Sequence, residues 1–430
     1  MEDLLITRIR RPRIPEVRTG LRRLGREKLG VYRGMLLKHL FQWPLRAAFR
    51  FLSRFVNREP NLILFGSVRN RLADNSAYLF LAMSRDPELL CVWISGSHKV
   101  VKQLRSHGYV AYRRWSLQGI KSAVRASFYV YSFATSDINL WLGDGAVNLN
   151  LWHGLGVKRI ERDRGAPWSR MYAASNRSLT GRVFADDRRP PDWLLTPSPE
   201  MCQYFAPPFD LPVDRCVNLG YPRNDHLLQR TPPPSILVDP KTYDLLEQHP
   251  FVVGYFPTWR YDSFEALPDG APSLDEIARV VSDNGGLTVF KPHHQSATPL
   301  GSDQSLVFLP ADCDLNAYLG LCHVLITDYS SVAADFLLLD RPIIIFAPDV
   351  DEDIAIGRFS ADPLSMQPGL LARTKEEMFD LLREIRSMPR PDNYTTLREH
   401  YWGSADADSA TAIGEFIKLK ALGSRATVSR

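Results

Sequence analysis

The chain lacks several features that would place it in a special class of protein. No apolar run reaches the length of about 18 residues that indicates a transmembrane helix. The opening residues, MEDLLITRIRRPRIPEVR, have no apolar core and no small-residue cleavage site, unlike a secretory signal. The five cysteines are scattered, odd in number and free of CxxC or Cys/His patterns, which favours a reducing compartment. We therefore expect a cytoplasmic protein.

Motifs for metal or nucleotide chemistry are also missing. The sequence has no Gly-rich Walker loop, no DxD pair after an apolar run and no His/Asp cluster with metal-ligand spacing. The pair Asp186-Asp187 is flanked by two arginines and reads as a loop. We therefore expect a reaction with no metal and no other cofactor, in which cationic side chains and helix dipoles stabilise charge.

Length and composition indicate an ordinary soluble protein with an uneven charge distribution. The 430 residues are 45% hydrophobic and 23% charged, enough for two or three domains. The net charge is +5, but residues 1–60 alone carry 15 Lys and Arg against five Asp and Glu. The remainder of the chain is therefore net acidic.

The basic segment 1–60 contains an amphipathic pattern. Apolar residues recur at three- and four-residue intervals from Leu37 to Phe55, and arginines follow a separate i, i+4 row: Arg46, Arg50, Arg54 and Arg58. One interpretation is a helix that binds an anionic membrane surface. The other is that the apolar face packs on the body of the protein while the arginines are solvated. Periodicity alone does not separate the two.

Beyond residue 60, short apolar runs alternate with helical patterns. This alternation predicts α/β domains with parallel sheets. The Pro-rich run at 231–234 is typical of a linker, which gives a first domain at 61–230 and a second at 235–430. We expect two Rossmann-like domains that face each other across a cleft.

The stretch from Val324 to Phe346 is a complete βαβ unit. An apolar run ends in Asp328-Tyr-Ser-Ser331, an apolar helix follows, and a second apolar run begins after Arg341-Pro342. The right-handed crossover puts the polar turn at the carboxyl edge of the sheet, where Ser330 and Ser331 could bind an anion. The alternative is that Asp328 and Ser330 only cap the helix.

Other polar clusters also follow apolar runs, at the edge where open α/β sheets bind ligands. They are Ser67 to Asn75, Trp152 to Gly154, Tyr221 to Asp225, Pro257 to Arg260, Lys291 to His294 and Asp328 to Ser331. Six such clusters from both halves of the chain indicate one shared site.

Two histidines are the candidate acid–base residues. His153 and His293 each follow an apolar run in corresponding positions of the two half-chains, and Gly154 allows close backbone approach beside the first. Either could instead be a core histidine with its hydrogen bonds satisfied. Alternate residues of an extended segment point in opposite directions, so His294 cannot face the same site as His293 and is a weaker candidate than His293.

Three basic residues of these polar clusters could neutralise the phosphates of a ligand. They are Arg223, Arg260 and Lys291. The alternative for each is an ordinary surface charge or ion pair.

The ordered motifs resemble one known family. The chain is similar to the CDP-glycerol glycerophosphotransferases of teichoic-acid and capsule synthesis, which have the two-domain GT-B fold. The resemblance covers about Asn61 to Ile417 and rests on ADNS, NLWHG, LTPSP, GYPRND, PTWR, KPH and TDYSS in this order. After WHG the chain has Leu-Gly-Val-Lys158, where the family usually has Thr-Pro before a lysine.

The resemblance implies roles for individual residues. His153 corresponds to the proposed general base, and His293 to a histidine at the donor phosphates beside Ser330 and Ser331. The other implied donor-binding residues are Thr258, Arg260, Lys291 and Asp328. Candidates for the acceptor side of the cleft are Asn75, Gly154, Arg223, Asn224 and Asp225.

We expect a transferase that moves glycerol phosphate, or a related alditol phosphate, from a CDP-linked donor to a hydroxyl of a polymer or lipid-linked acceptor, with release of CMP. Its expected place is the inner face of the cell membrane, on an anionic surface, without nucleic acid as a partner. One alternative is a GT-B glycosyltransferase that uses a nucleotide sugar for surface polysaccharide. A second is a membrane-bound scaffold without catalytic activity.

Overall fold

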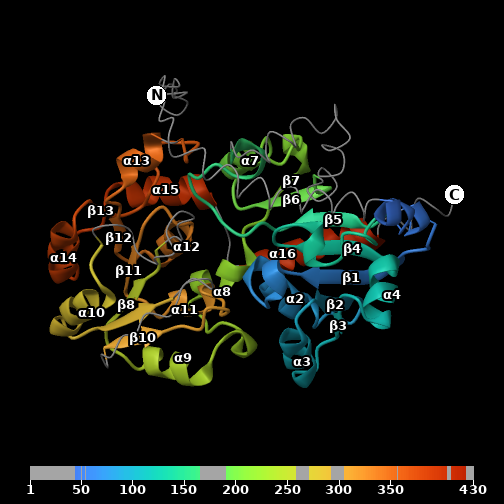
Figure 1. The fold of residues 1–430 in the computed structure, drawn as a ribbon, viewed down its shortest axis with the longest axis horizontal. Helices are drawn as coiled ribbons and strands as arrows, with labels where there is room; N and C mark the ends of the chain where they lie inside the picture. Colours follow the sequence, from blue (N-terminus) through green and yellow to red (C-terminus); the bar gives the residue numbers. More distant parts are fainter. Residues whose placement is uncertain are drawn as a thin grey trace, which may run out of the picture.

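The chain forms two α/β domains side by side (Figure 1). In the computed structural model, the described residues are 44–49, 51–53, 55–164, 190–257, 271–291, 305–355, 357–403 and 408–422. Each domain is built on one parallel sheet, and a segment that includes the predicted Pro-rich linker connects them.

The first sheet has seven strands in the order β3-β2-β1-β4-β5-β6-β7. Neighbouring strands are parallel, as the alternation of apolar runs and helices predicted. The strands are β1 (Glu59–Gly66), β2 (Leu90–Ser95), β3 (Ala111–Arg113), β4 (Ala126–Tyr131), β5 (Val147–Asn150), β6 (Trp193–Thr196) and β7 (Cys216–Asn218).

The second sheet has six parallel strands in the order β10-β9-β8-β11-β12-β13. The strand order reverses between β8 and β11, which is the switch point where open α/β sheets bind ligands. The strands are β8 (Val252–Tyr255), β9 (Leu287–Phe290), β10 (Leu306–Phe308), β11 (Val324–Thr327), β12 (Ile343–Phe346) and β13 (Leu370–Ala372).

Helices connect the strands and cover the sheets (Figure 1). In the first domain they are α2 (Asp74–Met83), α3 (His98–Ser106), α4 (Leu117–Arg125), α7 (Pro199–Phe205) and α8 (Asp225–Gln229). After the linker they are α9 (Pro240–Glu247), α10 (Leu274–Asp283), α11 (Asn316–Leu319), α12 (Val332–Phe336), α13 (Val350–Ala355), α14 (Lys375–Glu384), α15 (Asn393–Trp402) and α16 (Ser409–Leu422). None of the helices in the described part of the chain is long and apolar enough to cross a membrane.

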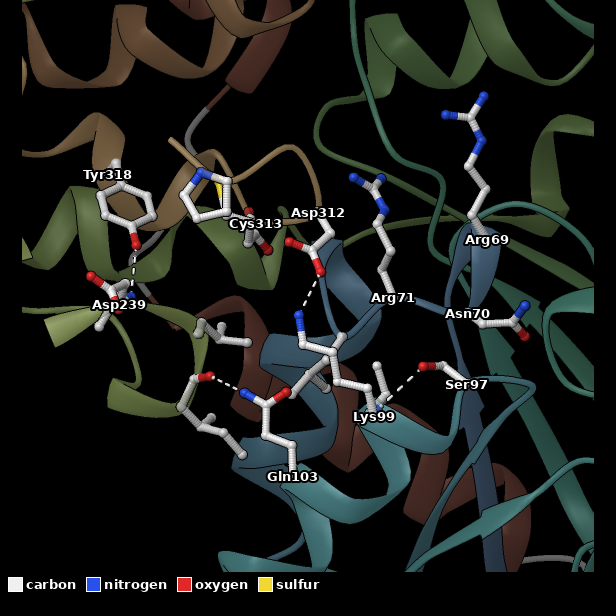
Figure 2. A pocket seen from close by; sticks show the side chains of 17 residues that line it. Arg69, Asn70, Arg71, Ser97, Lys99, Gln103, Asp239, Asp312, Cys313 and Tyr318 are labelled. Carbon is white, nitrogen blue, oxygen red and sulfur yellow. Dashed lines mark hydrogen bonds and ion pairs between the residues drawn. The ribbon is translucent and has the colours of Figure 1, made fainter. Parts of the chain in front are cut away.

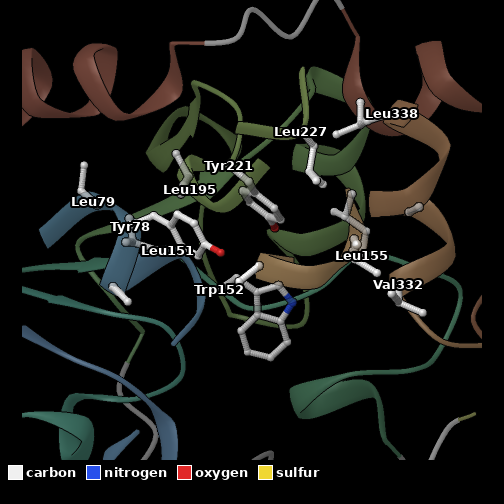
Figure 3. Packing of buried hydrophobic residues seen from close by; sticks show 14 of the residues in the cluster. Tyr78, Leu79, Leu151, Trp152, Leu155, Leu195, Tyr221, Leu227, Val332 and Leu338 are labelled. Carbon is white, nitrogen blue, oxygen red and sulfur yellow. The ribbon is translucent and has the colours of Figure 1, made fainter. Parts of the chain in front are cut away.

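The largest apolar core runs through both domains. Tyr78, Trp152 and Tyr221 of the first domain belong to the same buried cluster as Val332 and Leu338 of the second (Figure 3). Two smaller clusters fill the outer faces of the two sheets. A shared core resists separation of the domains, because parting them would expose apolar surface to water.

The last helix returns to the first domain. Helix α16 packs on α2 and on the strands β1 and β4 of the first domain (Figure 1). Asp225, the first residue of α8, accepts hydrogen bonds from the backbone N–H groups of Ser409 (3.1 Å) and Ala410 (2.9 Å). This carboxylate therefore caps the first turn of α16.

Residues 44–49 and 51–53 are helical, and this segment, the helix at 44–53, does not pack its apolar side chains on the body as the second sequence interpretation expected. The side chains of Phe51 and Leu52 are 58% and 61% exposed, whereas Arg46 is buried over the ring of Trp141. Arg58, beyond the helix, donates hydrogen bonds to backbone carbonyls, including that of Ala126 at 2.7 Å. The prediction of a row of solvent-facing arginines is therefore wrong for Arg46 and Arg58, because both find partners on the body.

Candidate active site

The two sheets meet where two of the predicted clusters come together. Gly154 follows β5 of the first domain, and Ser331 precedes α12 of the second. A Cβ atom built on Gly154 would lie only 2.9 Å from Ser331 Oγ. The WHG and DYSS motifs, far apart in the sequence, are thus in direct contact.

The backbone that carries His153 is held in an unusual conformation. Trp152 has a φ of 52°, in the left-handed region that non-glycine residues rarely adopt. Asn150 Oδ1 accepts a hydrogen bond from the N–H of Trp152 (2.9 Å). The buried Asn75 amide donates to the carbonyls of Leu151 (3.2 Å) and Trp152 (3.1 Å). Strained backbone that several partners hold in place is typical of functional sites.

One hydrogen bond defines the tautomer of His153. Its Nδ1 lies 3.0 Å from the carbonyl oxygen of Ser132, which can only accept. Nδ1 therefore carries the proton, and Nε2 is left as the basic nitrogen. The rings of Trp152 (4.1 Å between centroids) and Phe133 (5.5 Å) pack beside the half-buried imidazole. Burial, with a smaller contribution from the positive charge of Arg223, lowers the pKa of His153 to about 4, so the imidazole is neutral at pH 7.

Arg223 lies in a buried ion-pair network between the domains. Its guanidinium donates to Asp74 Oδ1 (2.7 Å) and to the carbonyl of His153 (2.7 Å) on the first domain. The other terminal nitrogen binds both oxygens of Asp335 on α12 (3.1 and 2.8 Å). Burial acts to lower the pKa of Arg223, but the charges of Asp335 and Asp74 outweigh it and raise the pKa. The group therefore stays charged and joins His153 to α12.

The neighbours of Arg223 extend the same network. Asn224 donates to Asp335 Oδ1 (2.7 Å) and accepts from the side-chain amide of Asn316 (2.9 Å). The backbone N–H of Arg223 donates to Asn75 Oδ1 (3.3 Å). The GYPRND cluster thus links residues of the first domain to Asp335 and Asn316 of the second. Its last residue, Asp225, caps α16. These contacts are structural and place Asn75, Arg223 and Asn224 directly behind His153.

The serines before α12 contribute little to capping that helix. Ser331 is the N-cap residue, yet its side chain makes no cap hydrogen bond. Ser330 Oγ is 3.5 Å from the N–H of Val332, at the limit for a hydrogen bond. Both serines are half-buried, and Asp328 behind them is buried. The helix that the sequence predicted to Leu339 is α-helical to Phe336 and continues as a 3₁₀ turn.

The remaining predicted donor residues are only partly described. Lys291 follows β9, and its ammonium group donates to the carbonyl of Ala311 (3.3 Å). Burial lowers the pKa of Lys291, and the positive charge of Arg71 lowers it further. Thr258, Arg260 and His293 lie outside the described residues. Among the described residues, no group of three or more His, Cys, Asp or Glu side chains is arranged to hold a metal ion.

Comparison with known proteins assigns the family. The sequence model described as CDP-Glycerol:Poly(glycerophosphate) glycerophosphotransferase matches residues 48–419. The chain belongs to this family. The match spans both domains and confirms the resemblance inferred from the ordered motifs. The chain is therefore an enzyme of the glycerophosphotransferase family.

Several curated members of the family are distant relatives. A teichoic acid glycerol-phosphate transferase of Staphylococcus aureus is 25% identical over 358 residues, which cover 81% of this chain and 90% of the relative. A teichoic acid poly(glycerol phosphate) polymerase of Staphylococcus epidermidis is 26% identical over 78% of this chain. That match covers 46% of the polymerase, so the chain spans about half the length of this relative.

Solved structures of the family confirm the fold. The wall teichoic acid polymerase TagF superposes with a TM-score of 0.70 at 20% identity, over 92% of this chain and 99% of the TagF chain. A TagF variant that was soaked with CDPG gives a TM-score of 0.71. The prediction of two Rossmann-like domains in a GT-B arrangement is thus confirmed.

The segment after the WHG motif, where the chain departs from the usual family pattern, ties the domains together. Lys158 forms an antiparallel bridge with Phe359 of the second domain. The N–H of Ser360 donates to the carbonyl of Val157 (2.8 Å), and the N–H of Arg159 to that of Arg358 (3.0 Å). The segment that carries His153 is therefore connected to the second domain by main-chain hydrogen bonds on one side and by Arg223 on the other.

Three residues that contribute to the site were not predicted. Ser132 acts through its backbone carbonyl, for which a sequence carries no signal. Asp335 is an acid inside the apolar helix VAADFLLL, a pattern that could have indicated a buried ion pair. Arg71 lies within the polar cluster after β1, but nothing distinguished it there from Arg69.

Proposed function

We propose that the chain transfers glycerol phosphate, or a related alditol phosphate, from a CDP-linked donor to a hydroxyl group of a teichoic-acid-type polymer or lipid-linked acceptor. The observation that carries the proposal is the state of His153. Its Nδ1–H is held by the carbonyl of Ser132, and its Nε2 is an unprotonated base beside the contact of Gly154 with Ser331. Family membership supports the substrate class.

The proposed step is an in-line displacement at phosphorus. The acceptor oxygen attacks the β-phosphorus of the donor and forms a new P–O bond, while its proton passes to Nε2 of His153. The bond between the β-phosphorus and the bridging oxygen breaks, and CMP departs with that oxygen. The product is a phosphodiester that is one alditol phosphate longer, and His153 later returns the proton to solvent.

The second domain would stabilise the charge on the phosphates. The Ser331 hydroxyl does not cap α12, and the Ser330 hydroxyl makes at most a long hydrogen bond to its first turn. Lys291 offers a cation after β9, two strands from β11 in the same sheet. Arg260 and His293, assigned to the donor by motif, would complete this set. Removal of one such group typically costs about 2.7–4 kcal/mol of transition-state stabilisation.

A donor panel tests the proposal against its rivals. The full-length protein is incubated with an acceptor preparation and, separately, with CDP-glycerol, CDP-ribitol and UDP- and GDP-linked sugars. We expect CMP release only with the CDP-alditols. Release of UDP or GDP would favour a sugar transferase, and the absence of release from every donor would favour a scaffold.

We also propose that the enzyme works at the inner face of the cell membrane. The helix at 44–53 supports this, because its apolar side chains project away from the body. Phe51, Leu52 and Phe55 are 58–73% exposed. Leu45, Phe49 and Trp115 continue the exposed apolar surface, and Trp141 joins Phe49 to Trp115 by ring contacts. Such a patch suits the interfacial region of a bilayer.

A further inference from the structure

A cavity of about 520 Å³ lies at one end of the interface between the domains. Its walls come from the loops after β1 and β2 and helix α3 of the first domain, the linker, and the loop after β10 (Figure 2). None of Gly154, Asp328, Ser330 and Ser331 lines it. Lys291 adjoins the cavity through its hydrogen bond to the carbonyl of Ala311, so the cavity borders the donor residues of the second domain and extends away from Ser330 and Ser331.

One wall presents two arginines from a strained loop. Arg69 and Asn70 both have positive φ angles, 57° and 60°. The loop is pinned by Asn70, whose Oδ1 accepts from the N–H of Gly96 (2.7 Å) and from Arg114 (2.8 Å). Arg114 is itself fixed by the carbonyl of Ile138 (2.7 Å). Two adjacent left-handed residues cost on the order of 1–3 kcal/mol each, which indicates that this conformation serves a purpose.

The purpose suggested by the side chains is to place Arg71. In Figure 2, Arg69 and Arg71 extend in the same direction from the two sides of the turn. Among the described residues, the Arg71 side chain has no hydrogen-bond or ion-pair partner, and its Nε is buried without one. Arg71 lines the cavity, and its charge acts to lower the pKa of Lys291 and, more weakly, that of His153, so it lies within electrostatic reach of both. A partly buried guanidinium without a partner is a site for an anion.

Lys99 supplies a second cation at the mouth. Its ammonium group is 2.9 Å from Asp312 Oδ2, across the interface (Figure 2). Both side chains are mostly exposed, at 77% and 60%, so the ion pair is weak and an incoming anion can compete for Lys99.

The other acids of the lining are already engaged. Asp314 is buried and accepts hydrogen bonds from the N–H groups of Asp74 (2.7 Å) and Asn316 (2.9 Å). Asp239 caps α9 by accepting from the N–H and hydroxyl of Thr242. Asp312 feels the charge of Arg71 but is hydrogen-bonded to Lys99, so the hydrogen-bond donors of Arg71 are available to a ligand.

We infer that this cavity binds the acceptor chain through a phosphodiester group upstream of the attacking hydroxyl, with Arg71 and Lys99 as the phosphate ligands. The inference rests on the proposed function, in which the acceptor is a chain of alditol phosphates. A polymer with one negative charge per unit would extend from His153 past Arg71 into the cavity. The enzyme would thereby recognise a growing chain by its negative charge, while the second domain binds the donor.

Charge-removing variants and a matched control test this assignment. The variants are Arg71→Gln and Lys99→Gln, and the control is Lys102→Gln, which removes an exposed charge from the same helix α3 outside the cavity. The full-length enzyme is assayed with CDP-glycerol and two acceptors: an oligo(glycerol phosphate), and a glycerol-terminated acceptor with no phosphodiester. Loss of a charged hydrogen bond should raise KM for the oligo(glycerol phosphate) about tenfold or more. KM for CDP-glycerol, and KM for the acceptor without phosphodiester, should stay within about twofold.

The outcomes separate this inference from the proposed function. A wild-type enzyme that releases no CMP from CDP-glycerol with either acceptor would overturn the proposed function itself. An active wild type whose Arg71→Gln and Lys99→Gln variants behave like Lys102→Gln would overturn only the acceptor site. A rise in KM for CDP-glycerol instead would assign the cavity to the donor. Direct titration with the oligo(glycerol phosphate) should show the same loss of affinity, and unchanged binding would contradict the inference.

Discussion

Gly154 of the first domain lies against Ser331 of the second, so closely that a Cβ atom on the glycine would be 2.9 Å from the serine Oγ and 3.2 Å from its Cβ. This contact joins the residue after His153 to the N-cap of α12. It therefore fixes the distance between the proposed base and the proposed phosphate-binding serines.

Gly154→Ala should reduce turnover by displacing Ser331. Gly154 does not have a positive φ, so the added methyl group acts through the contact and not through backbone strain. Because misplacement of about 1 Å can cost on the order of 10²-fold, we expect a fall in kcat of that size, measured as CMP release. Gly320→Ala is the control, since its Cβ would meet only Leu227 Cδ2 at 3.6 Å. Equal activity of the two variants would show that the contact does not matter.

His153→Gln should remove the base and leave the donor site intact. General-base catalysis contributes about 10²–10⁴-fold, so kcat should fall by that factor while calorimetric binding of CDP-glycerol stays close to wild type. His293→Ala should weaken donor binding as well, because that histidine is assigned to the phosphates. Retained turnover in His153→Gln would remove it from the mechanism.

The pH profile provides a second readout for His153. Burial lowers its pKa to about 4, so the neutral, basic form persists well below pH 6.5. We expect kcat/KM to stay level on the acid side down to about pH 5 and to fall only below that value. Circular dichroism at each pH shows that the protein remains folded. An acid limb near pH 6.5, in a folded protein, would mean that the imidazole is solvated.

Arg223→Ala should destabilise the protein rather than only reduce donor binding. Removal of one partner from a buried ion pair typically costs about 3–5 kcal/mol, and here the buried Asp335 and the partly buried Asp74 would both lose their partner. Arg383→Ala is the control, because its pair with Asp380 is exposed and worth about 0–1 kcal/mol. The measurement is urea unfolding of both variants. Similar stabilities would indicate that the network is solvated.

The apolar patch on the helix at 44–53 should attach the enzyme to membranes. Replacing Phe51 and Leu52 together by Ser should release the protein from vesicles with anionic lipid, because these exposed side chains would no longer be buried at the interface. Leu419→Ser, at an equally exposed leucine of α16, is the control. Arg46→Glu should instead lower the melting temperature, since Arg46 packs on Trp141. Flotation of the double variant with vesicles would exclude this patch as the anchor.

The strands were the most predictable part of the fold. Buried parallel strands are short runs of apolar and β-branched residues, and the predicted run at 324–327 has the bounds of β11. Strand β13, a run of three residues directly after Gly369, was not predicted. The polar clusters at Gly154 and Ser331 were predictable because the carboxyl ends of parallel strands share one edge.

The roles of the arginines were not predictable in the same way. For Arg223 the sequence left phosphate binding and an ion pair open, because its partners Asp74 and Asp335 are 149 and 112 residues away in the sequence. Arg46 was expected in solvent, but Trp141 covers it. The sequence does not show whether the partner of a charged residue is a ligand, a carboxylate or water. Only the tertiary contacts identify that partner.

The central claim is that the bond broken lies between the two phosphates of the donor. CDP-glycerol carrying ³²P at the β-phosphorus is incubated with the enzyme and acceptor, and the label is followed by chromatography. The account predicts that the label enters the acceptor chain as a phosphodiester while unlabelled CMP is released. Label that stays on the nucleotide, as CDP, would mean that a C–O bond breaks as in a sugar transferase, and would contradict the account.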